Sequence, residues 1–313
     1  MALHQASGRW RLGLLLAIIT AACWASLPVA LKVTLEQLDA MTLTWFRFLV
    51  ATIVMFAWLS WRGGLSAFKS LDGKRWWHLI AAALLLIGNY VFYLWGVQYT
   101  TPANAQLLIQ LAPLLMALGG IFIFREPYQF GQWCGLAIIA CGLVLFFSDQ
   151  LKGTALGTQA YLIGSGSVIF AAVVWAGYAL IQKQLLLRLN SQMILFFIYA
   201  VATLFLLPFA EPKKIFELDG KHAWALAYCA LNTLIAYGAF AEALVHWQAS
   251  RVSAILAVTP LLCLAVVAIV HSISPGTIAS EHVTALGYIG AVLVVIGSSL
   301  SSLLGQKKAE TNK

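Results

Sequence analysis

The charged residues that could do chemistry in this sequence lie within long apolar stretches. Glu242 and His246 are four residues apart, so they share one face of a helix and could hold or pass a proton. Arg47 stands alone among apolar neighbours and could attract the carboxylate of a ligand. The alternatives are a structural Glu–His pair and an arginine that extends to lipid headgroups or to a helix C-terminus.

Uncharged polar and aromatic residues form a second set of candidates. Asn89 and Tyr93 are four residues apart and share a face that could hydrogen-bond a polar molecule and stack on it. Trp24 and Trp175 lie near the middle of their segments, away from the interfacial belts where membrane tryptophans usually occur. Interhelical hydrogen bonding or packing is the alternative for each residue. The set also includes Gln110, Tyr178, Asn232 and Tyr237.

The sequence patterns of common catalytic sites are missing. Glu242-x-x-x-His246 has one histidine, so it is not the H-E-x-x-H zinc motif, and there is no P-loop or G-x-S-x-G. The five cysteines lie in apolar stretches without a C-x-x-C pair. We therefore expect no enzyme activity, no cofactor and no metal. The alternative class, a membrane-embedded enzyme or accessory subunit acting on lipid-linked substrates, would carry clustered His, Asp or Glu residues at one membrane face.

The composition indicates a chain that lies mostly in the lipid bilayer. Of its 313 residues, 62% are hydrophobic and 10% are charged, and the mean hydropathy is +0.88. About a quarter of the residues of a soluble domain are charged, so this chain cannot cover a soluble surface. The net charge of +8 comes from basic residues in short gaps between apolar segments, without a long basic run. We expect no nucleic-acid partner.

The apolar segments predict ten membrane-spanning helices. Each segment approaches or exceeds the roughly 20 residues that cross a bilayer, and helices satisfy their own backbone hydrogen bonds there. The predicted fold is therefore an all-α polytopic membrane protein. The predicted spans are 12–32, 41–61, 76–98, 103–124, 131–148, 157–182, 191–209, 223–247, 250–271 and 283–304.

The distribution of basic residues predicts the orientation. If both termini are cytoplasmic, thirteen of the nineteen Lys and Arg residues lie inside, five lie outside, and Arg47 lies within the membrane. Cytoplasmic loops are usually the more basic ones. We expect a multi-pass protein of the cell inner (plasma) membrane with cytoplasmic N- and C-termini, although three lysines in the outer loop 210–222 weaken the bias locally.

The two halves of the chain, 1–152 and 153–313, are similar to each other. Trp24-Ala25-Ser26 matches Trp175-Ala176-Gly177, and Pro113-Leu114-Leu115 matches Pro260-Leu261-Leu262. Each half contains five spans, an odd number, so the second half enters the membrane from the opposite side. The sequence therefore predicts two inverted five-helix repeats, an arrangement typical of alternating-access transporters. Further matches join Glu126, Gly135 and Gly142 to Glu281, Gly290 and Gly297.

With these features the chain resembles the EamA-type exporters of the drug/metabolite transporter superfamily, over about residues 12–304. The resemblance implies export of small metabolites such as amino acids. It also implies a cavity between the halves, lined mainly by the first, third, fourth, sixth, eighth and ninth helices. The expected partners are a small-molecule substrate and the lipid bilayer, and a homodimer stays open. Import, or transport of sugar conjugates, is the alternative within transporters. Pro113 and Pro260 would bend two matching helices that act as gates.

Overall fold

The computed structural model describes residues 9–62, 73–124, 129–153, 158–186, 189–247, 249–278 and 283–304. Its regular elements are all helices, with no β-sheet among the described residues, which confirms the predicted all-α class. Glu126 and Glu281, which matched between the halves, lie outside the described residues.

The helices follow the predicted spans closely. The first half contains α1 (Trp10–Thr34), α2 (Ala40–Trp61), α3 (Gly73–Tyr99), α4 (Pro102–Leu108), α5 (Leu111–Phe124) and α6 (Phe130–Gly153). The second half contains α7 (Thr158–Leu185), α8 (Ser191–Leu206), α9 (Gly220–His246), α10 (Ala249–Leu256), α11 (Thr259–Ile273) and α12 (Ala285–Leu304). Two 3₁₀ helices, η2 (Leu207–Phe209) and η3 (Pro212–Glu217), lie between α8 and α9.

The described helices provide the predicted membrane crossings. Nine stretches of the described residues are long and apolar enough to cross a bilayer, and Ala285–Ser301 is a shorter apolar helix that supplies the tenth. Large apolar side chains such as Phe122, Leu204 and Ile235 are exposed on the surface of the bundle. An apolar surface of this kind suits contact with lipid rather than water.

The fourth and ninth spans are each broken in two, whereas the sequence predicted continuous, bent helices. The first half of the fourth span, α4, ends at Leu108, and its partner α10 in the ninth span ends at Leu256. A proline removes one backbone donor and clashes with the carbonyl four residues earlier. Pro113 and Pro260 place that clash at Ile109 and Leu256, which is where the two breaks occur.

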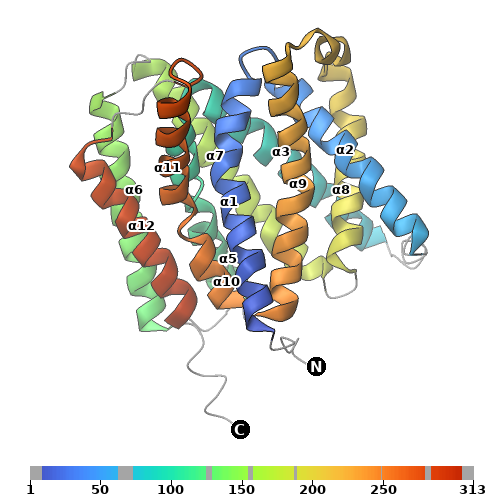
Figure 1. Cartoon of the computed structure of the whole chain (residues 1–313). Helices are drawn as coiled ribbons and strands as arrows, with labels where there is room; N and C mark the ends of the chain where they lie inside the picture. The colour runs from blue at the N-terminus through green and yellow to red at the C-terminus, as the bar shows by residue number, and fades with distance from the viewer. Residues whose placement is uncertain are drawn as a thin grey trace.

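Helices of the two halves interleave throughout the bundle. The helix α1 packs on α9, α3 on α7, α2 on α8, α4 on α11 and α6 on α12 (Figure 1). In the internal repeat, α1 corresponds to α7 and α3 corresponds to α9. The α1–α9 and α3–α7 contacts are therefore equivalent. The hydroxyls of Thr52 and Thr203, at the offset that matches Trp24 to Trp175, lie 3.1 Å apart. The core is therefore formed between the halves rather than within each half.

Matched glycines allow α6 and α12 to approach closely. A Cβ atom on Gly142 would lie 2.6 Å from the carbonyl oxygen of Gly290, and one on Gly290 would lie 2.7 Å from that of Gly142. Gly135 and Gly297 have the same reciprocal relation at 2.7 and 2.6 Å. Small residues commonly permit such contacts in membranes. The fifth and tenth spans are therefore in close contact in the described structure.

Candidate functional site

Arg47 lies inside the bundle and not at its surface. Its side chain is on α2, the residue is only 3% exposed, and its Nε and Nη2 atoms donate to Thr233 Oγ1 on α9 at 3.1 and 3.0 Å. Thr233 in turn donates to the carbonyl oxygen of Cys229 at 3.0 Å, which fixes its hydroxyl. The guanidinium carbon lies 4.9 Å from the centre of the Tyr90 ring, a distance suited to a cation–π contact. The arginine therefore does not extend to headgroups in this structure.

Tyr90 and Tyr199 lie beside this arginine, and together with two tyrosines close to Tyr90 they are called here the tyrosine cluster: Tyr90, Tyr178, Tyr199 and Tyr237. Phe48, next to Arg47 on α2, packs against Tyr90 and Tyr199 with ring centres 4.7 and 5.6 Å apart. Tyr237 lies near the other three tyrosines. The offset that matches Pro113 to Pro260 also matches Tyr90 to Tyr237. Each half therefore contributes one equivalent tyrosine to the tyrosine cluster.

Tryptophans from both halves border the tyrosine cluster. Trp24 on α1 contacts Tyr237 edge to face, with ring centres 5.8 Å apart, and Trp175 on α7 lies 6.5 Å from Tyr178 in the same manner. Trp24, Trp175 and Tyr237 are half-buried although they lie between packed helices. The structure places each of these predicted tryptophans beside one of the predicted tyrosines, Trp24 beside Tyr237 and Trp175 beside Tyr178. That these four residues bind a substrate stays a prediction.

The predicted amide candidates have more varied surroundings. Asn89 is buried and donates to the carbonyl oxygen of Ala171 on α7 at 3.0 Å, which is the interhelical bond that we named as the alternative. Tyr93 donates to Gln106 on α4 at 3.0 Å, and Gln110 lies half-buried at the break between α4 and α5. Asn232 donates to the carbonyl oxygen of Cys23 at 2.8 Å, so it joins α9 to α1.

Glu242 and His246 are paired but do not join the arginine. Glu242 Oε1 and His246 Nε2 lie 3.0 Å apart, as expected from their spacing. However, the Glu242 side chain is 57% exposed, so it is not enclosed by protein. No ion pair between Glu242 and Arg47 exists in the described structure. No group of three or more metal-ligating side chains occurs among the described residues either.

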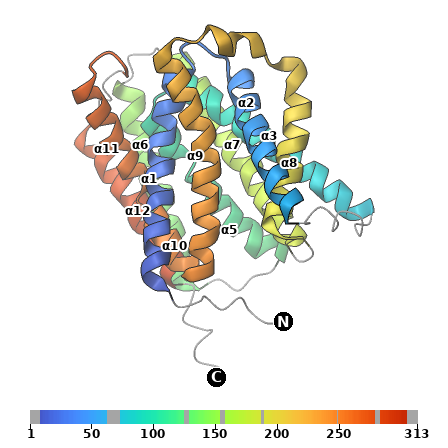
Figure 2. The same cartoon turned by 45° about the vertical axis from the view of Figure 1, so that its right-hand side comes forward.

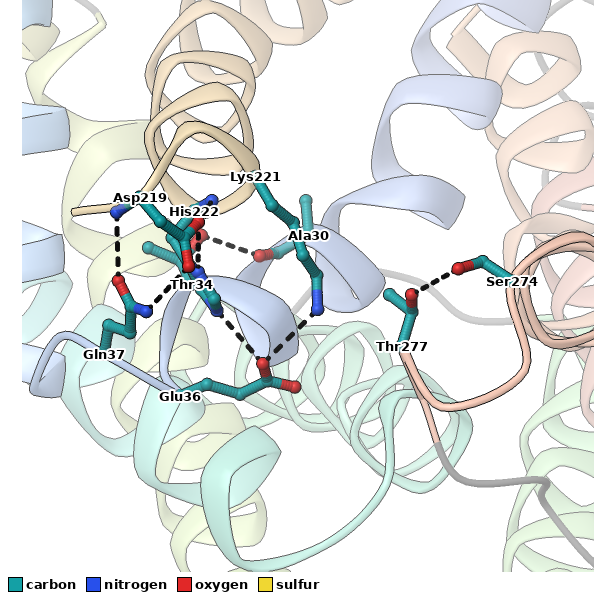
Figure 3. Close-up of polar contacts among 9 residues, drawn as sticks. All are labelled: Ala30, Thr34, Glu36, Gln37, Asp219, Lys221, His222, Ser274 and Thr277. Atoms are coloured by element: carbon teal, nitrogen blue, oxygen red, sulfur yellow. Dashed lines mark hydrogen bonds and ion pairs between the residues drawn. The ribbon is translucent and has the colours of Figure 1, made fainter.

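Hydrogen bonds join α1 to α3 and to α9 at the end of the bundle opposite to the start of α1 and the end of α12 (Figure 1). Figure 3 shows those between α1 and α9. Lys32 Nζ donates to the carbonyl oxygens of Val97, Gln98 and Thr100, so it caps the C-terminus of α3 at 2.6–2.8 Å. His222 lies between two carboxylates, at 2.7 Å from Asp219 and 3.0 Å from Glu36.

Asp219 begins α9 as its N-cap and also joins it to α1. Its carboxylate accepts from the His222 backbone N–H at 3.0 Å and from Gln37 Nε2 at 2.9 Å (Figure 3). These hydrogen bonds, first among them the one from the His222 backbone, lower the pKa of Asp219 to about 2. Glu36, Gln37, Asp219 and His222 are called the α1–α9 clasp below.

The two ends of the bundle are packed differently. At the end that carries the clasp, α4 packs against both α1 and α11. At the other end, where α1 begins and α12 ends, α5 and α10 are the matching halves of the broken spans, and they make no extensive contact within the described structure. The turned view in Figure 2 shows α5 and α10 on different sides of α9. The bundle is therefore closed at the clasp end and less tightly closed at the terminal end.

The EamA-like transporter family profile matches residues 11–148 and again residues 162–303. The chain belongs to this family. It is therefore a multi-pass membrane transporter of the drug/metabolite transporter superfamily, and the resemblance drawn from the sequence is confirmed. The two matches fall in the two predicted halves, while the division at 152/153 stays a prediction.

Relatives of the EamA-like chain carry transporter names. It is 37% identical over 293 residues to the uncharacterized inner membrane transporter YhbE of Escherichia coli K12, covering 93% of this chain and 91% of the relative. An uncharacterized transporter of Haemophilus influenzae is 35% identical, with 93% and 95% covered. A probable amino-acid metabolite efflux pump of Salmonella typhimurium is 22% identical, with 90% and 92% covered.

A solved structure supports the EamA-like chain's fold. This crystal structure, described only as that of a protein, has a TM-score of 0.63 and 18% identity, and the similarity covers 95% of this chain and 99% of the other. At this identity the likeness shows the fold alone.

Sequence reasoning missed several residues of the site. Thr233, Tyr90 and Tyr199 surround Arg47, and Gln106, not Gln110, bonds to Tyr93. Tyr90 could have been found from its match to the candidate Tyr237 in the other half. Thr233 carried no such signal, because a lone threonine in an apolar helix usually bonds to its own backbone.

Proposed function

We propose that this transporter exports small metabolites across the inner membrane by alternating access, with both termini in the cytoplasm. The observation that carries the proposal is the pair of matching breaks before Pro113 and Pro260. The broken helices lie where the two repeats meet, which is where discontinuous helices form the substrate site in other inverted-repeat transporters. The break also lets each half-span move separately, because its two parts share no continuous hydrogen-bond ladder.

The packing difference between the two ends supports a conformation open toward the cytoplasm. If the termini are cytoplasmic, as the distribution of Lys and Arg favours, the closed clasp end faces outward. A substrate would enter between α5 and α10 and leave when the α4–α11 contact opens. The names of the relatives, an inner membrane transporter and a probable amino-acid metabolite efflux pump, support the same location and direction. They favour transport over the membrane-enzyme alternative.

A cysteine cross-link tests alternating access directly. Leu107 on α4 and Leu264 on α11 belong to one packed group of buried side chains. In a variant without the five native cysteines, Leu107→Cys with Leu264→Cys should lose transport after oxidation and regain it after reduction. Each single cysteine variant is the control. Transport that continues at full rate through the oxidised pair would contradict alternating access.

The direction is tested by loading cells with labelled amino acids and related metabolites and following their exit. Cells that express the protein should lose the transported compound faster than cells with an empty vector. Faster accumulation instead of exit would replace export with the import alternative.

A further inference from the structure

We propose that the transported molecule carries a carboxylate and that the Arg47 guanidinium binds it. The inference rests on the proposed transport function and adds the chemical class of the substrate. It is carried by the position of Arg47, which is a cation inside a membrane-spanning bundle with only neutral partners.

The guanidinium presents donors in the geometry that a carboxylate needs. Of its five N–H donors, those on the Nε and Nη2 edge are directed at Thr233 Oγ1. The Nη1 atom has no hydrogen bond to a described residue, so the Nη1–Nη2 edge stays available for two parallel hydrogen bonds. Thr233 and the Tyr90 ring hold the plane of the group, so little ordering is lost when the ligand binds.

The charge of Arg47 is not neutralised by the described protein. A buried charge costs several kcal/mol of desolvation unless an opposite charge compensates it. No carboxylate of the described residues is paired with Arg47. At the matching place in the other half stands Ile198, which is fully buried, so the repeat supplies no second charge. An anionic ligand would provide the compensation that the protein itself does not.

The available edge of Arg47 is not completely enclosed by the described protein. Polar atoms that are fully enclosed without a partner occur at Thr44, Trp45, Asn232 and Trp247, but no nitrogen of Arg47 is among them. The Nη1 atom, which lacks a hydrogen bond, therefore borders accessible space. The half-buried rings of Tyr237 and Trp24 contact each other, and Tyr237 lies near Tyr90, the ring against Arg47. These rings suit the apolar body of a small carboxylate.

The single positive charge of Arg47 suits a ligand with a carboxylate better than one with a phosphate. A phosphate monoester carries nearly two negative charges near neutral pH and is usually bound by several donors or cations. The lysine on α1, Lys32, already caps α3 through three carbonyl oxygens. One guanidinium matches the charge and the two oxygens of one carboxylate.

The test uses four compounds that share one side chain: leucine, leucinamide, 4-methylpentanoate and 4-methylpentanamide. The first and third carry a carboxylate, and the first two carry an ammonium group. Binding to the purified protein is followed by tryptophan fluorescence, and movement is followed by counterflow in proteoliposomes. A carboxylate preference over the matched amide of about 10- to 100-fold is expected, as for charge-assisted hydrogen bonds. The ammonium comparison separates a zwitterion from a simple anion as the preferred form.

Variants of Arg47 test whether this residue causes the carboxylate preference. Arg47→Gln should abolish it, and Arg47→Lys should retain part of it, because lysine keeps the charge but not the two-pronged geometry. The matched control is Arg62→Gln, at the exposed end of the same helix, where Arg62 stacks on Trp58 at 4.4 Å. This control should bind carboxylates like the wild type.

The outcomes separate the inference from the proposed function. If the wild type binds and moves the amides as well as the carboxylates, the carboxylate assignment is wrong while transport stands, and this result needs no variant. The same holds if folded Arg47→Gln keeps the preference. If the wild type moves none of the four compounds and none of a wider metabolite panel, the export proposal fails and the assignment fails with it.

Discussion

At the scale of single residues, the hydroxyl of Thr233 orients the buried Arg47 side chain. Thr233 Oγ1 accepts from two nitrogens of Arg47 while giving its own proton to the Cys229 carbonyl. Because the Thr233 hydroxyl proton is donated to Cys229, the oxygen lone pairs of this hydroxyl are held toward the Arg47 guanidinium. Arg47 therefore depends on a residue of the other half of the chain for its orientation.

Replacing this hydroxyl tests its role. Thr233→Val keeps the shape but removes the acceptor, so two buried donors lose their partner at a cost of about 1–3 kcal/mol in stability. Carboxylate binding should weaken several-fold in the fluorescence titration. Thr52→Val, which removes the Thr52–Thr203 contact away from Arg47, is the control. Equal loss of carboxylate binding in both variants would contradict a specific role for Thr233.

The α1–α9 clasp gives a pH-dependent prediction. The pKa of Asp219 is lowered to about 2, so its carboxylate stabilises the folded protein fully above its ordinary value of 3.8 and progressively less as the pH falls toward 2. Asp219→Asn should therefore lower the melting temperature at pH 7, and the difference from wild type should shrink as the pH falls from 4 toward 2. The control is Glu217→Gln, an exposed carboxylate nearby in η3. A difference that does not change with pH would show that the charge of Asp219 is not its source.

At the scale of elements, proline decides where the fourth and ninth spans break. Pro113 and Pro260 lie just inside α5 and α11, and each break falls at or next to the carbonyl that the proline ring would meet. Proline alone does not break a helix in this bundle, because Pro28 lies within the uninterrupted α1. The two spans that break contact each other through α4 and α11.

Restoring the helices should slow transport more than it harms folding. In Pro113→Ala with Pro260→Ala, each alanine N–H can complete the helical ladder, which favours one rigid helix over two movable halves. The folded yield should be kept while the counterflow rate falls by roughly 10-fold or more, in line with a gating step. Pro28→Ala is the control and should transport at a nearly normal rate. An unchanged rate in the double variant would remove the breaks from the mechanism.

The α6–α12 contact is the most demanding helix pair sterically. A Cβ atom on Gly142 would meet backbone atoms, the Gly290 oxygen at 2.6 Å and the Val294 nitrogen at 2.8 Å, and neither can move aside alone. Gly142→Ala should therefore lower the melting temperature and the folded yield. Gly238→Ala on α9, where nothing lies within 4 Å of the added atom, should be neutral or stabilising by up to about 1 kcal/mol through helix propensity. Equal tolerance of both alanines would contradict the close approach.

At the scale of the whole molecule, the two repeats form one core and cannot be separated into independent domains. The strongest helix pairs, such as α6 with α12 and α3 with α7, each join the halves. A movement of one repeat against the other would change all of these contacts together. This is the property that alternating access requires of an inverted repeat.

The orientation in the membrane can be measured by reporter fusions. Fusions after Lys74 and Lys308 should report the cytoplasm, and fusions after Lys152 and Lys214 should report the opposite side, because the basic residues favour cytoplasmic termini. Lys152 follows the fifth span. The side on which it lies relative to Lys74 therefore reports whether the first repeat crosses the membrane an odd number of times. The inverted arrangement is wrong if these two fusions lie on the same side.

Hydropathy and spacing by themselves determined the helical class, the ten spans, the repeat and the family of this chain. These features are properties of short sequence windows, because each helix satisfies its own backbone in lipid wherever the others lie. Tertiary structure decided which side chains meet, since packing sets the rotation of each helix about its axis. Arg47 turns inward to Thr233, 186 residues away, while Glu242, equally conspicuous in the sequence, is 57% exposed. No local pattern distinguishes those two outcomes. Each charge lies in an apolar segment, and the packing of the other helices decides whether it is enclosed.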